Sequence, residues 1–313
     1  MAGLETNPPS HPAQDRQQLK TVKYVGRFAP SPTGPLHFGS LIAAVGSYLD
    51  AHSQGGQWLV RIEDVDEPRC KQTHADDILR TLDTYGFQWD GEVVYQRHRE
   101  QFYQHALQQL VDAGHAYPCA CTRREIADSS VSGLEGPVYP GTCRSGLNGR
   151  AARAWRVRVN DAPICFDDRI QGHHCQHLET DVGDFLVKRA DGFFAYQLAA
   201  VVDDAEQGVT HIVRGADLLA STPRQIHLQY LLVYTIPDYL HLPVVLNETG
   251  QKLCKQTLAP PLDRKHCAET LFQALGFLGL APPVELRHES ASIILGWGMD
   301  NWRNNMVAGL RRV

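Results

Sequence analysis

The segment at residues 24–40, YVGRFAPSPTGPLHFGS, constrains the fold more than any other part of the chain. Its apolar beginning predicts a buried strand, and the prolines and glycines that follow interrupt regular structure. Helical spacing of apolar residues resumes at residues 41–49. A strand, a turn and a helix start in this order leave unpaired N–H groups and the positive end of the helix dipole at one edge of a sheet. The segment therefore predicts an anion site, where Gly34 and Gly39 allow close backbone approach and His37 adds a donor.

The next stretch of the chain continues the alternation of strands and helices. Residues 57–62 have the apolar composition of a second buried strand, and residues 76–85 and 100–113 have helical periodicity. This order predicts an α/β fold built on a doubly wound parallel sheet. Glu63 directly follows the second strand, where such folds place ligands, although a solvated acidic loop is the alternative.

Composition argues against two classes of protein and indicates a compartment. No apolar run approaches the length of about 18 residues that a membrane span needs. A net charge of −5 argues against an extensive nucleic-acid-binding surface. Eight cysteines without a secretory signal predict a reducing, cytoplasmic location, where thiols bind metals or lie buried. The polar, proline-containing residues 1–21 predict a disordered leader.

Cys119, Cys121 and Cys143 lie in a segment rich in glycine, serine and proline that could hardly build a core of its own. Three thiolates, two of them spaced as Cys-x-Cys, are ligands that Zn²⁺ prefers. A fourth ligand is needed, and the spacing alone leaves both His115 and Tyr139 open. Three reduced structural cysteines without a metal are the alternative.

Other patterns in the middle of the chain favour ordinary surface structure. The five arginines within residues 144–158 predict a strand with one solvated face, with an RNA-phosphate patch as the alternative. The Gly-His-His-Cys-Gln-His tract at residues 172–177 predicts an exposed strand or loop rather than a metal site. Three cysteines are isolated in the sequence and receive no functional role: Cys70, Cys165 and Cys267.

The second half of the chain returns to strands and helices. Residues 185–188 and 193–198 are expected to form two strands joined by an Asp-Gly turn, with Tyr196 on the second strand. Arg214 stands in Ile-Val-Arg-Gly-Ala-Asp-Leu, which predicts another strand, and residues 222–233 predict a helix. Each of these segments taken alone is a routine element that carries one polar side chain.

The ordered series at residues 27–40, Arg-Phe-Ala-Pro-Ser-Pro-Thr-Gly-Pro-Leu-His-Phe-Gly-Ser, resembles the ATP-binding signature of class I aminoacyl-tRNA synthetases of the glutamyl and glutaminyl branch. Lys-Leu-Cys-Lys-Gln at residues 252–256 is similar to their second signature, Lys-Met-Ser-Lys-Ser, with Cys254 and Gln256 in place of serines. The cysteine spacing narrows the resemblance to the glutamyl-Q tRNA(Asp) synthetases, which implies Tyr139 as the fourth zinc ligand. The resemblance covers roughly residues 22–260.

This resemblance implies an enzyme that activates L-glutamate with ATP and Mg²⁺ and transfers it to queuosine in the anticodon loop of tRNA(Asp). The catalytic residues that it implies are His37, Lys252 and Lys255. The implied glutamate site consists of Arg27, Ser31, Glu63, Tyr196 and Arg214. The implied ATP site consists of Pro30, Gly34, His37, Gly39, Ser40 and Lys255, and the implied structural zinc site of Cys119, Cys121, Tyr139 and Cys143. Two guanidinium forks suit the two carboxylates of glutamate.

The implied architecture is a Rossmann-type catalytic domain interrupted by a zinc-bearing acceptor-type subdomain. Its expected parts are a leader (1–21), two catalytic halves (22–115 and 191–260), the inserted subdomain (116–190) and a short helical C-terminal part (261–313). The chain after the second signature is too short for a separate anticodon-reading domain of about 100 residues, and a monomer is expected. The alternatives are a truncated glutamyl-tRNA synthetase, a nucleotidyltransferase of the same superfamily that adenylates another acid, and a non-enzymatic zinc RNA-binding module.

Overall fold

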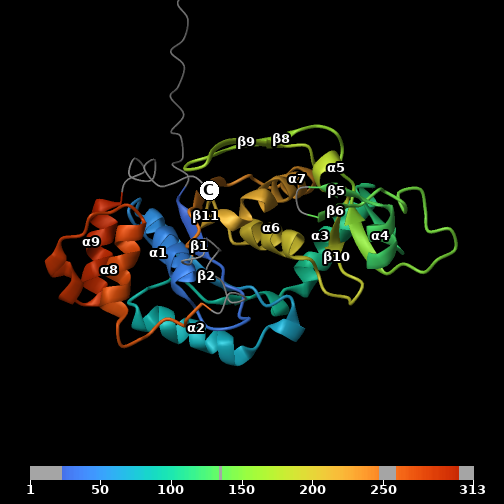
Figure 1. Ribbon diagram of the computed structural model, residues 1–313. Helices are drawn as coiled ribbons and strands as arrows, with labels where there is room; N and C mark the ends of the chain where they lie inside the picture. The colour runs from blue at the N-terminus through green and yellow to red at the C-terminus, as the bar shows by residue number, and fades with distance from the viewer. Residues whose placement is uncertain (1–22, 134–135, 247–258, 303–313) are drawn as a thin grey trace, which may run out of the picture.

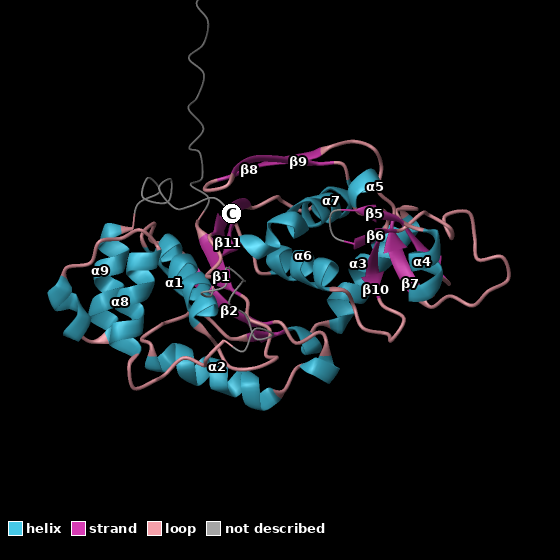
Figure 2. Ribbon diagram, in the orientation of Figure 1, coloured by secondary structure: helices cyan, strands magenta, loops and turns pink. Residues whose placement is uncertain are grey.

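The structure is a computed structural model that describes residues 23–133, 136–246 and 259–302. Strands of a central sheet alternate with helices, and a smaller antiparallel sheet is inserted midway (Figure 1, Figure 2). The strands are β1 (Val25–Phe28), β2 (Gln57–Ile62), β3 (Val94–Tyr95), β4 (Ala116–Cys119), β5 (Val131–Gly133), β6 (Gly136–Val138), β7 (Ala154–Val157), β8 (Ile164–Asp168), β9 (Gly172–Gln176), β10 (Phe185–Lys188), β11 (His211–Gly215) and β12 (Asp238–Leu242). The helices are α1 (Phe38–His52), α2 (Gln72–Thr84), α3 (Glu100–Asp112), α4 (Arg123–Ser129), α5 (Leu178–Asp181), α6 (Tyr196–Glu206), α7 (Thr222–Leu232), α8 (Cys267–Phe277) and α9 (Ala291–Asn301). Among the described residues, no helix combines the length and apolarity needed to cross a membrane.

The central sheet is parallel and grows in both directions from β1. On one side β1 pairs with β2, with Val25 opposite Gln57, and β2 pairs with β3. On the other side the N–H of Thr210, which leads into β11, donates to the carbonyl of Val25 at 2.9 Å, and β11 pairs with β12. The order β3-β2-β1-β11-β12 confirms the predicted α/β fold with parallel strands. It also creates a switch point between β1 and β11, where such sheets bind ligands beyond the carboxyl ends of their strands.

Helices cover both faces of this sheet and enclose two apolar cores. α1 packs on β1, β2 and β11, and α8 and α9 pack against α1. Trp58 is fully buried in this core. α3, α6 and α7 pack against one another on the other side, with Leu198 fully buried (Figure 1). Gly46 of α1 lies so close to β12 that a Cβ there would be 2.5 Å from Leu242 Cδ1. A larger residue would therefore require the side chain of Leu242 or α1 itself to shift.

An inserted unit with its own antiparallel sheet occupies one end of the molecule (Figure 1). Its strands pair in the order β10-β7-β4, with Ala116 of β4 opposite Val157 of β7. The β8–β9 hairpin runs from this unit back to the central sheet, where Asp168 of β8 pairs with Tyr239 of β12 (Figure 2). The hairpin thus links the inserted unit to the strands that carry the switch point.

The segment around Tyr196 differs from its prediction as a strand. Phe194 makes one isolated bridge with Lys188, and α6 begins at Tyr196. Leu198 and Val202, four residues apart, are buried in the second core, which is a helical spacing. A short apolar run does not distinguish a strand from a buried helix by periodicity, so tertiary packing decides its form.

The prediction that Cys165 is isolated is also wrong. Antiparallel pairing of β8 with β9 puts Cys165 directly opposite Cys175, and the two form a disulfide. The sequence separation of 10 residues is not informative by itself, because the hairpin register brings the sulfurs together. The tract that contains Cys175 forms β9, on which His173 and Cys175 are exposed.

Candidate active site

A cavity of about 510 Å³ lies at the switch point between β1 and β11. It is bordered by the turn that follows β1, the start of α1 and the segment after β12. The predicted site residues that line it are Arg27, Pro30, Ser31, His37, Gly39, Ser40, Glu63, Tyr196 and Arg214. Gly34 is buried within the same turn but does not line the cavity. Lys252 and Lys255 lie outside the described residues.

Two buried arginines reach the cavity from neighbouring strands. Arg27 of β1 is 3% exposed, and its Nε donates to Asp204 at 3.0 Å. Arg214 of β11 donates from Nε to His241 at 3.0 Å and from Nη2 to Thr222 at 2.8 Å. The Nη1 of Arg214 is buried and has no hydrogen-bond acceptor among the described residues. Buried guanidinium groups are rarely left unpaired, so this edge of Arg214 is suited to an anionic group in the cavity.

A buried network of charges lies beneath the cavity. Arg61 is fully buried, donates to Asp204 at 2.8 Å and lies 3.8 Å from Asp203. Glu63 lies 3.5 Å from Arg61 and is 8% exposed. Burial raises the pKa of Glu63 to about 7, although Arg61 and Arg27 act in the opposite direction. A cation bound beside Glu63 would favour its charged form, so this side of the cavity suits an ammonium group.

The turn and the start of α1 present hydrogen-bond donors to the same cavity. His37 is the N-cap residue of α1, and its Nδ1 accepts the N–H of Ser40 at 3.3 Å. The hydroxyl of Ser40 accepts the N–H of His37 at 2.8 Å, which completes a capping box. Acceptance at Nδ1 puts the proton of a neutral ring on Nε2. The helix behind this cap has 15 residues, so its dipole adds to the donors and favours phosphate oxygens.

The three candidate zinc-binding cysteines converge with Tyr139 in the inserted unit. Cys121 Sγ lies 3.6 Å from Cys143 Sγ and 3.6 Å from the Oη of Tyr139. The same Oη lies 3.5 Å from Cys119 Sγ. Tetrahedral Zn–S bonds of about 2.3 Å put ligand sulfurs about 3.8 Å apart, so the cluster has suitable dimensions. Among the described residues, the side chains close enough to share one metal ion here include the three cysteines but not His115.

Arg156 is buried against this cluster. The prediction that this arginine lies on the solvated face of a strand is therefore wrong. Its guanidinium carbon lies 3.8 Å from the centre of the Tyr139 ring, and its Nε is 3.4 Å from Cys119 Sγ. Burial raises the pKa of the Cys143 thiol, but hydrogen bonds from Tyr139 and from the N–H of Ala120 outweigh burial and lower it to about 7. Hydrogen-bond donors therefore favour the thiolate form of Cys143, whereas burial raises the pKa of Cys121.

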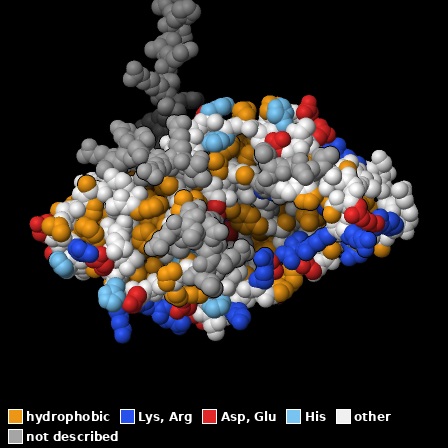
Figure 3. Space-filling view, viewed as in Figure 1, with side chains coloured by type: hydrophobic (Ala, Val, Ile, Leu, Met, Phe, Trp, Pro, Cys, Tyr) orange, Lys and Arg blue, Asp and Glu red, His pale blue; other side chains and the backbone are white. Residues whose placement is uncertain are grey.

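Other arginines of the same stretch also hold the inserted unit together. Arg144 donates to Asp184 from two nitrogens, each at 2.6 Å, and Arg158 lies over the ring of Tyr117 at 4.6 Å. Arg153 is exposed. In the view of Figure 3, Lys and Arg side chains gather on the surface around β10 and α4. The buried arginines are structural, and the RNA-phosphate interpretation stays a prediction for the exposed ones.

Comparisons with known proteins agree with this geometry. The family model "tRNA synthetases class I (E and Q), catalytic domain" matches residues 23–280. A relative named Glutamyl-Q tRNA(Asp) synthetase from Dechloromonas aromatica is 59% identical over 287 residues, which is 91% of this chain and 95% of the relative. Another of the same name from Chromobacterium violaceum is 56% identical over 290 residues, 92% of this chain and 97% of the relative. The chain belongs to the glutamyl-Q tRNA(Asp) synthetase family.

Members of this family are ligases of the class I aminoacyl-tRNA synthetase type, and so is this chain. Its fold is similar to that of a glutamate tRNA ligase from Elizabethkingia meningosepticum, solved in complex with its amino acid, with a TM-score of 0.73 and 23% identity. A glutamate-tRNA synthetase from Elizabethkingia anophelis has a TM-score of 0.74 and 22% identity. These matches cover 93% and 90% of this chain but 66% of each of those chains. The chain therefore spans about two thirds of their length.

The sequence did not predict the side chains that accept hydrogen bonds from the two arginines of the cavity in this glutamyl-Q tRNA(Asp) synthetase family member. Asp204 of α6 accepts from Arg27, and His241 of β12 accepts from Arg214. Asp168 of β8 in turn lies 2.7 Å from the Nδ1 of His241. The available signal was a polar residue inside an apolar run, since a buried polar side chain needs a partner. A polar residue in an apolar run does not show which residue it contacts, because α6, β12 and β8 are far apart in the sequence.

Proposed function

We propose that this member of the glutamyl-Q tRNA(Asp) synthetase family activates L-glutamate with ATP and transfers the glutamyl group to queuosine in the anticodon loop of tRNA(Asp). One observation carries the proposal: the buried side chains of Arg27, Arg214 and Glu63 line one cavity, and the Nη1 of Arg214 finds no acceptor within the described residues. Glutamate has the complementary charges, which are two carboxylates and one ammonium group. The names of the relatives supply the acceptor.

Glutamate binds with its carboxylates at the two guanidinium groups and its ammonium group at Glu63. Charge-assisted hydrogen bonds to a guanidinium fork are strong and directional, and a glutamine side chain would make less use of a second cation. Tyr196 and Ser31 add hydroxyl groups to the same cavity. Activation then follows when a glutamate carboxylate oxygen attacks the α-phosphorus of ATP, the bond to the β-phosphate breaks and pyrophosphate leaves.

ATP lies over the turn at residues 30–40, with its phosphates near the start of α1. His37 donates to a phosphate oxygen from Nε2, and Lys252 and Lys255 supply positive charge from the segment outside the described residues. Mg²⁺ bound with ATP would neutralise part of the phosphate charge. The protein itself contributes orientation of the two substrates and stabilisation of developing charge.

Zn²⁺ would be held by Cys119, Cys121, Cys143 and Tyr139 in an inserted subdomain at residues 116–190. The distances among these ligand atoms support the assignment, and the guanidinium of Arg156 offsets thiolate charge. Four protein ligands would leave no open position, so the metal would be structural and would stabilise a segment with little core of its own. The catalytic halves at 22–115 and 191–260 flank this subdomain, with the leader at 1–21 and the helical part at 261–313 outside them.

The tRNA is bound at the end of the molecule that carries the inserted unit. Exposed arginines there include Arg123, Arg124 and Arg153, and phosphate contacts of this kind weaken with salt. A compact monomer in the cytoplasm selects the anticodon by admitting the anticodon loop itself to the active site. Unstacked bases of a single-stranded loop are readable on their edges, which suits this arrangement.

Two assays test the proposal separately. ATP–pyrophosphate exchange with a panel of amino acids should depend on glutamate, and exchange with glutamine or aspartate but none with glutamate would overturn the pocket assignment. Labelled glutamate is then offered to tRNA(Asp) with and without queuosine. Label is expected on the queuosine-containing tRNA alone and away from the 3′-terminal ribose. Equal labelling of both tRNAs, or label on that ribose, would make an ordinary glutamyl-tRNA synthetase the better assignment.

A further inference from the structure

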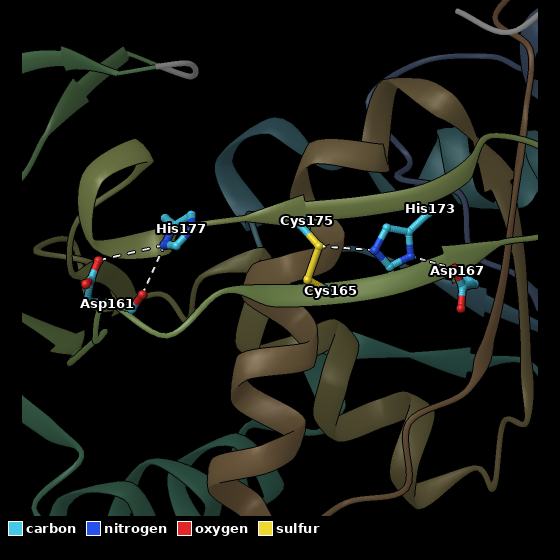
Figure 4. Close-up of a disulfide and its surroundings, with 6 residues drawn as sticks. All are labelled: Asp161, Cys165, Asp167, His173, Cys175 and His177. Carbon is cyan, nitrogen blue, oxygen red and sulfur yellow. Dashed lines mark hydrogen bonds and ion pairs between the residues drawn. A yellow bond between two sulfur atoms is a disulfide. The ribbon is translucent and has the colours of Figure 1, made fainter.

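The outward face of the β8–β9 hairpin carries a cluster of reactive side chains that the proposed synthetase reaction does not use. Successive side chains of a strand alternate between its two faces. β8 exposes Cys165 and Asp167, and β9 exposes His173 and Cys175. The residue next to Asp167, Asp168, is buried on the opposite face. Figure 4 shows the four exposed side chains in one row along the hairpin.

Within this row an imidazole contacts one of the two disulfide sulfurs. The Nε2 of His173 lies 3.3 Å from the Sγ of Cys175, and its Nδ1 lies 2.7 Å from the Oδ1 of Asp167 (Figure 4). Because a carboxylate can only accept, Nδ1 carries a proton, and in the neutral ring the lone pair of Nε2 faces the sulfur. Asp167, His173 and Cys175 thus form the arrangement of an orienting carboxylate, a base and a nucleophile.

We propose that Cys165 and Cys175 are a reversible thiol–disulfide pair that reacts with low-molecular-weight disulfides such as glutathione disulfide, with Cys175 as the attacking thiol and His173 as its base. Both cysteines are exposed, so a small disulfide can reach them. The thiolate is the reactive form of cysteine, and a neighbouring imidazole raises its population. Cys119 and Cys143, by contrast, are buried, so a small disulfide has far less access to them.

The exchange balances with the small disulfide as the oxidant. The Nε2 of His173 takes the thiol proton of Cys175, and the thiolate attacks one sulfur of glutathione disulfide, whose S–S bond breaks and releases one glutathione thiolate. A mixed disulfide is left on Cys175. The thiolate of Cys165 then attacks the Cys175 sulfur and releases the second glutathione. The protein loses two electrons and two thiol protons, and one small disulfide becomes two thiols.

The hairpin register makes the second attack available without rearrangement. Cys165 and Cys175 are direct partners in the antiparallel ladder, and their Cα atoms are 4.1 Å apart. Pairs on both sides of them keep this register, since Ile164 is opposite Gln176 and Phe166 is opposite His174. The resolving thiol is therefore held beside the mixed disulfide, whichever small thiol it carries.

The test follows the two cysteines in the full-length chain. Reduced protein is exposed to glutathione and glutathione disulfide in defined ratios, free thiols are trapped with N-ethylmaleimide, and peptides are identified by mass spectrometry. The Cys165–Cys175 peptide should form with glutathione disulfide and disappear with excess glutathione. A pair that glutathione disulfide does not oxidise, or that glutathione does not reduce, would overturn the proposal.

Variants of the exposed histidines test the role of the base. His173→Gln should slow oxidation by glutathione disulfide about tenfold, because less Cys175 is thiolate at neutral pH. The matched control is His177→Gln, because His177 is an exposed histidine directly after β9 and its Nδ1 lies 3.0 Å from the carbonyl oxygen of Asp161, away from the two cysteines (Figure 4). This control should oxidise at the wild-type rate. Equal rates for His173→Gln and wild type would remove His173 from the mechanism.

Single-cysteine variants test which sulfur attacks. Cys165→Ser should accumulate glutathione on Cys175, and Cys175→Ser should take up glutathione at Cys165 about tenfold more slowly. Asp167 orients the ring of His173 and therefore acts as a positioning residue. Asp167→Asn and His173→Gln should both move the half-oxidation point of the pair toward a lower proportion of glutathione disulfide, because each variant weakens the stabilisation of the thiolate in the reduced protein. Equal glutathione uptake by the two single-cysteine variants would overturn the assignment. It would also be overturned if a metal ion bound the reduced pair and blocked its oxidation.

Discussion

Arg214 donates a hydrogen bond from its Nε to the Nε2 of His241 across 3.0 Å, and both side chains are buried. On the opposite side of the ring, Nδ1 lies 2.7 Å from the carboxylate of Asp168. The ring is therefore neutral, since one nitrogen donates to Asp168 while the other accepts from Arg214. Through this contact, a residue of the β8–β9 hairpin orients an arginine of the cavity.

The first prediction concerns the pH dependence of this contact. Burial lowers the pKa of His241 to about 4, with Asp168 opposing and Arg214 assisting. An unfolded imidazole has a pKa of about 6.5, so the unfolded chain binds this proton more readily. The stabilisation from His241 is complete above about pH 6.5 and is lost as the pH falls to about 4, by up to about 3 kcal/mol.

Urea unfolding of wild type and His241→Gln across this pH range measures the effect. The difference in free energy of unfolding between them should shrink as the pH falls, because the variant lacks the titrating ring. The control His105→Gln changes an exposed histidine of α3 and should leave the pH dependence as in wild type. A difference that stays constant from pH 7 to pH 4 would contradict the prediction.

The second prediction concerns Glu63, whose carboxyl group has its pKa raised to about 7 by burial. In the proposed function the charged form binds the substrate ammonium group, so protonation below about pH 7 should weaken glutamate use. We expect kcat/KM for glutamate-dependent pyrophosphate exchange to fall about tenfold per pH unit below that value. Glu63→Gln should lower kcat/KM by roughly 10²-fold and remove this limb of the profile. A flat profile between pH 8 and pH 6 in the wild type would exclude Glu63 from this role.

The third prediction concerns Lys255 of the second signature. Lys255→Ala should reduce glutamate-dependent pyrophosphate exchange by roughly 10²-fold or more, the scale for loss of one charge stabiliser of the transition state. Lys265→Ala removes an exposed lysine from the described part of the chain and serves as the control. Comparable exchange rates in the two variants would argue against a role for Lys255.

The fourth prediction concerns the metal. Freshly purified, reduced protein should contain about one zinc per chain, because the ligand atoms of Cys119, Cys121, Cys143 and Tyr139 converge. Cys143→Ser should lose the metal and expose the segment between Cys119 and Cys143 to proteolysis, whereas Cys267→Ser in α8 should keep it. Metal analysis without zinc in the wild type would end the assignment.

Much of the fold and of the site was predictable from local signals. The prolines and glycines at residues 30–35 stop a strand, and the apolar spacing that follows starts a helix, so the turn before α1 and its donors follow from the sequence. The resemblance to class I synthetases is confirmed by the family match over residues 23–280. Tyr196 was assigned to the pocket with the wrong secondary structure, since its motif identifies the residue but not the helix that carries it.

The sequence by itself determined the elements with strong periodicity, the signature turn and the residue types proposed to bind glutamate, ATP and zinc, because each depends on neighbours within a few residues. Tertiary structure alone decided which charges meet. Arg156 is buried over Tyr139, His241 connects Asp168 to Arg214, and Cys165 faces Cys175. The physical reason is that a buried polar group must find its partner across the sheet register, and that register depends on packing between segments far apart in the chain.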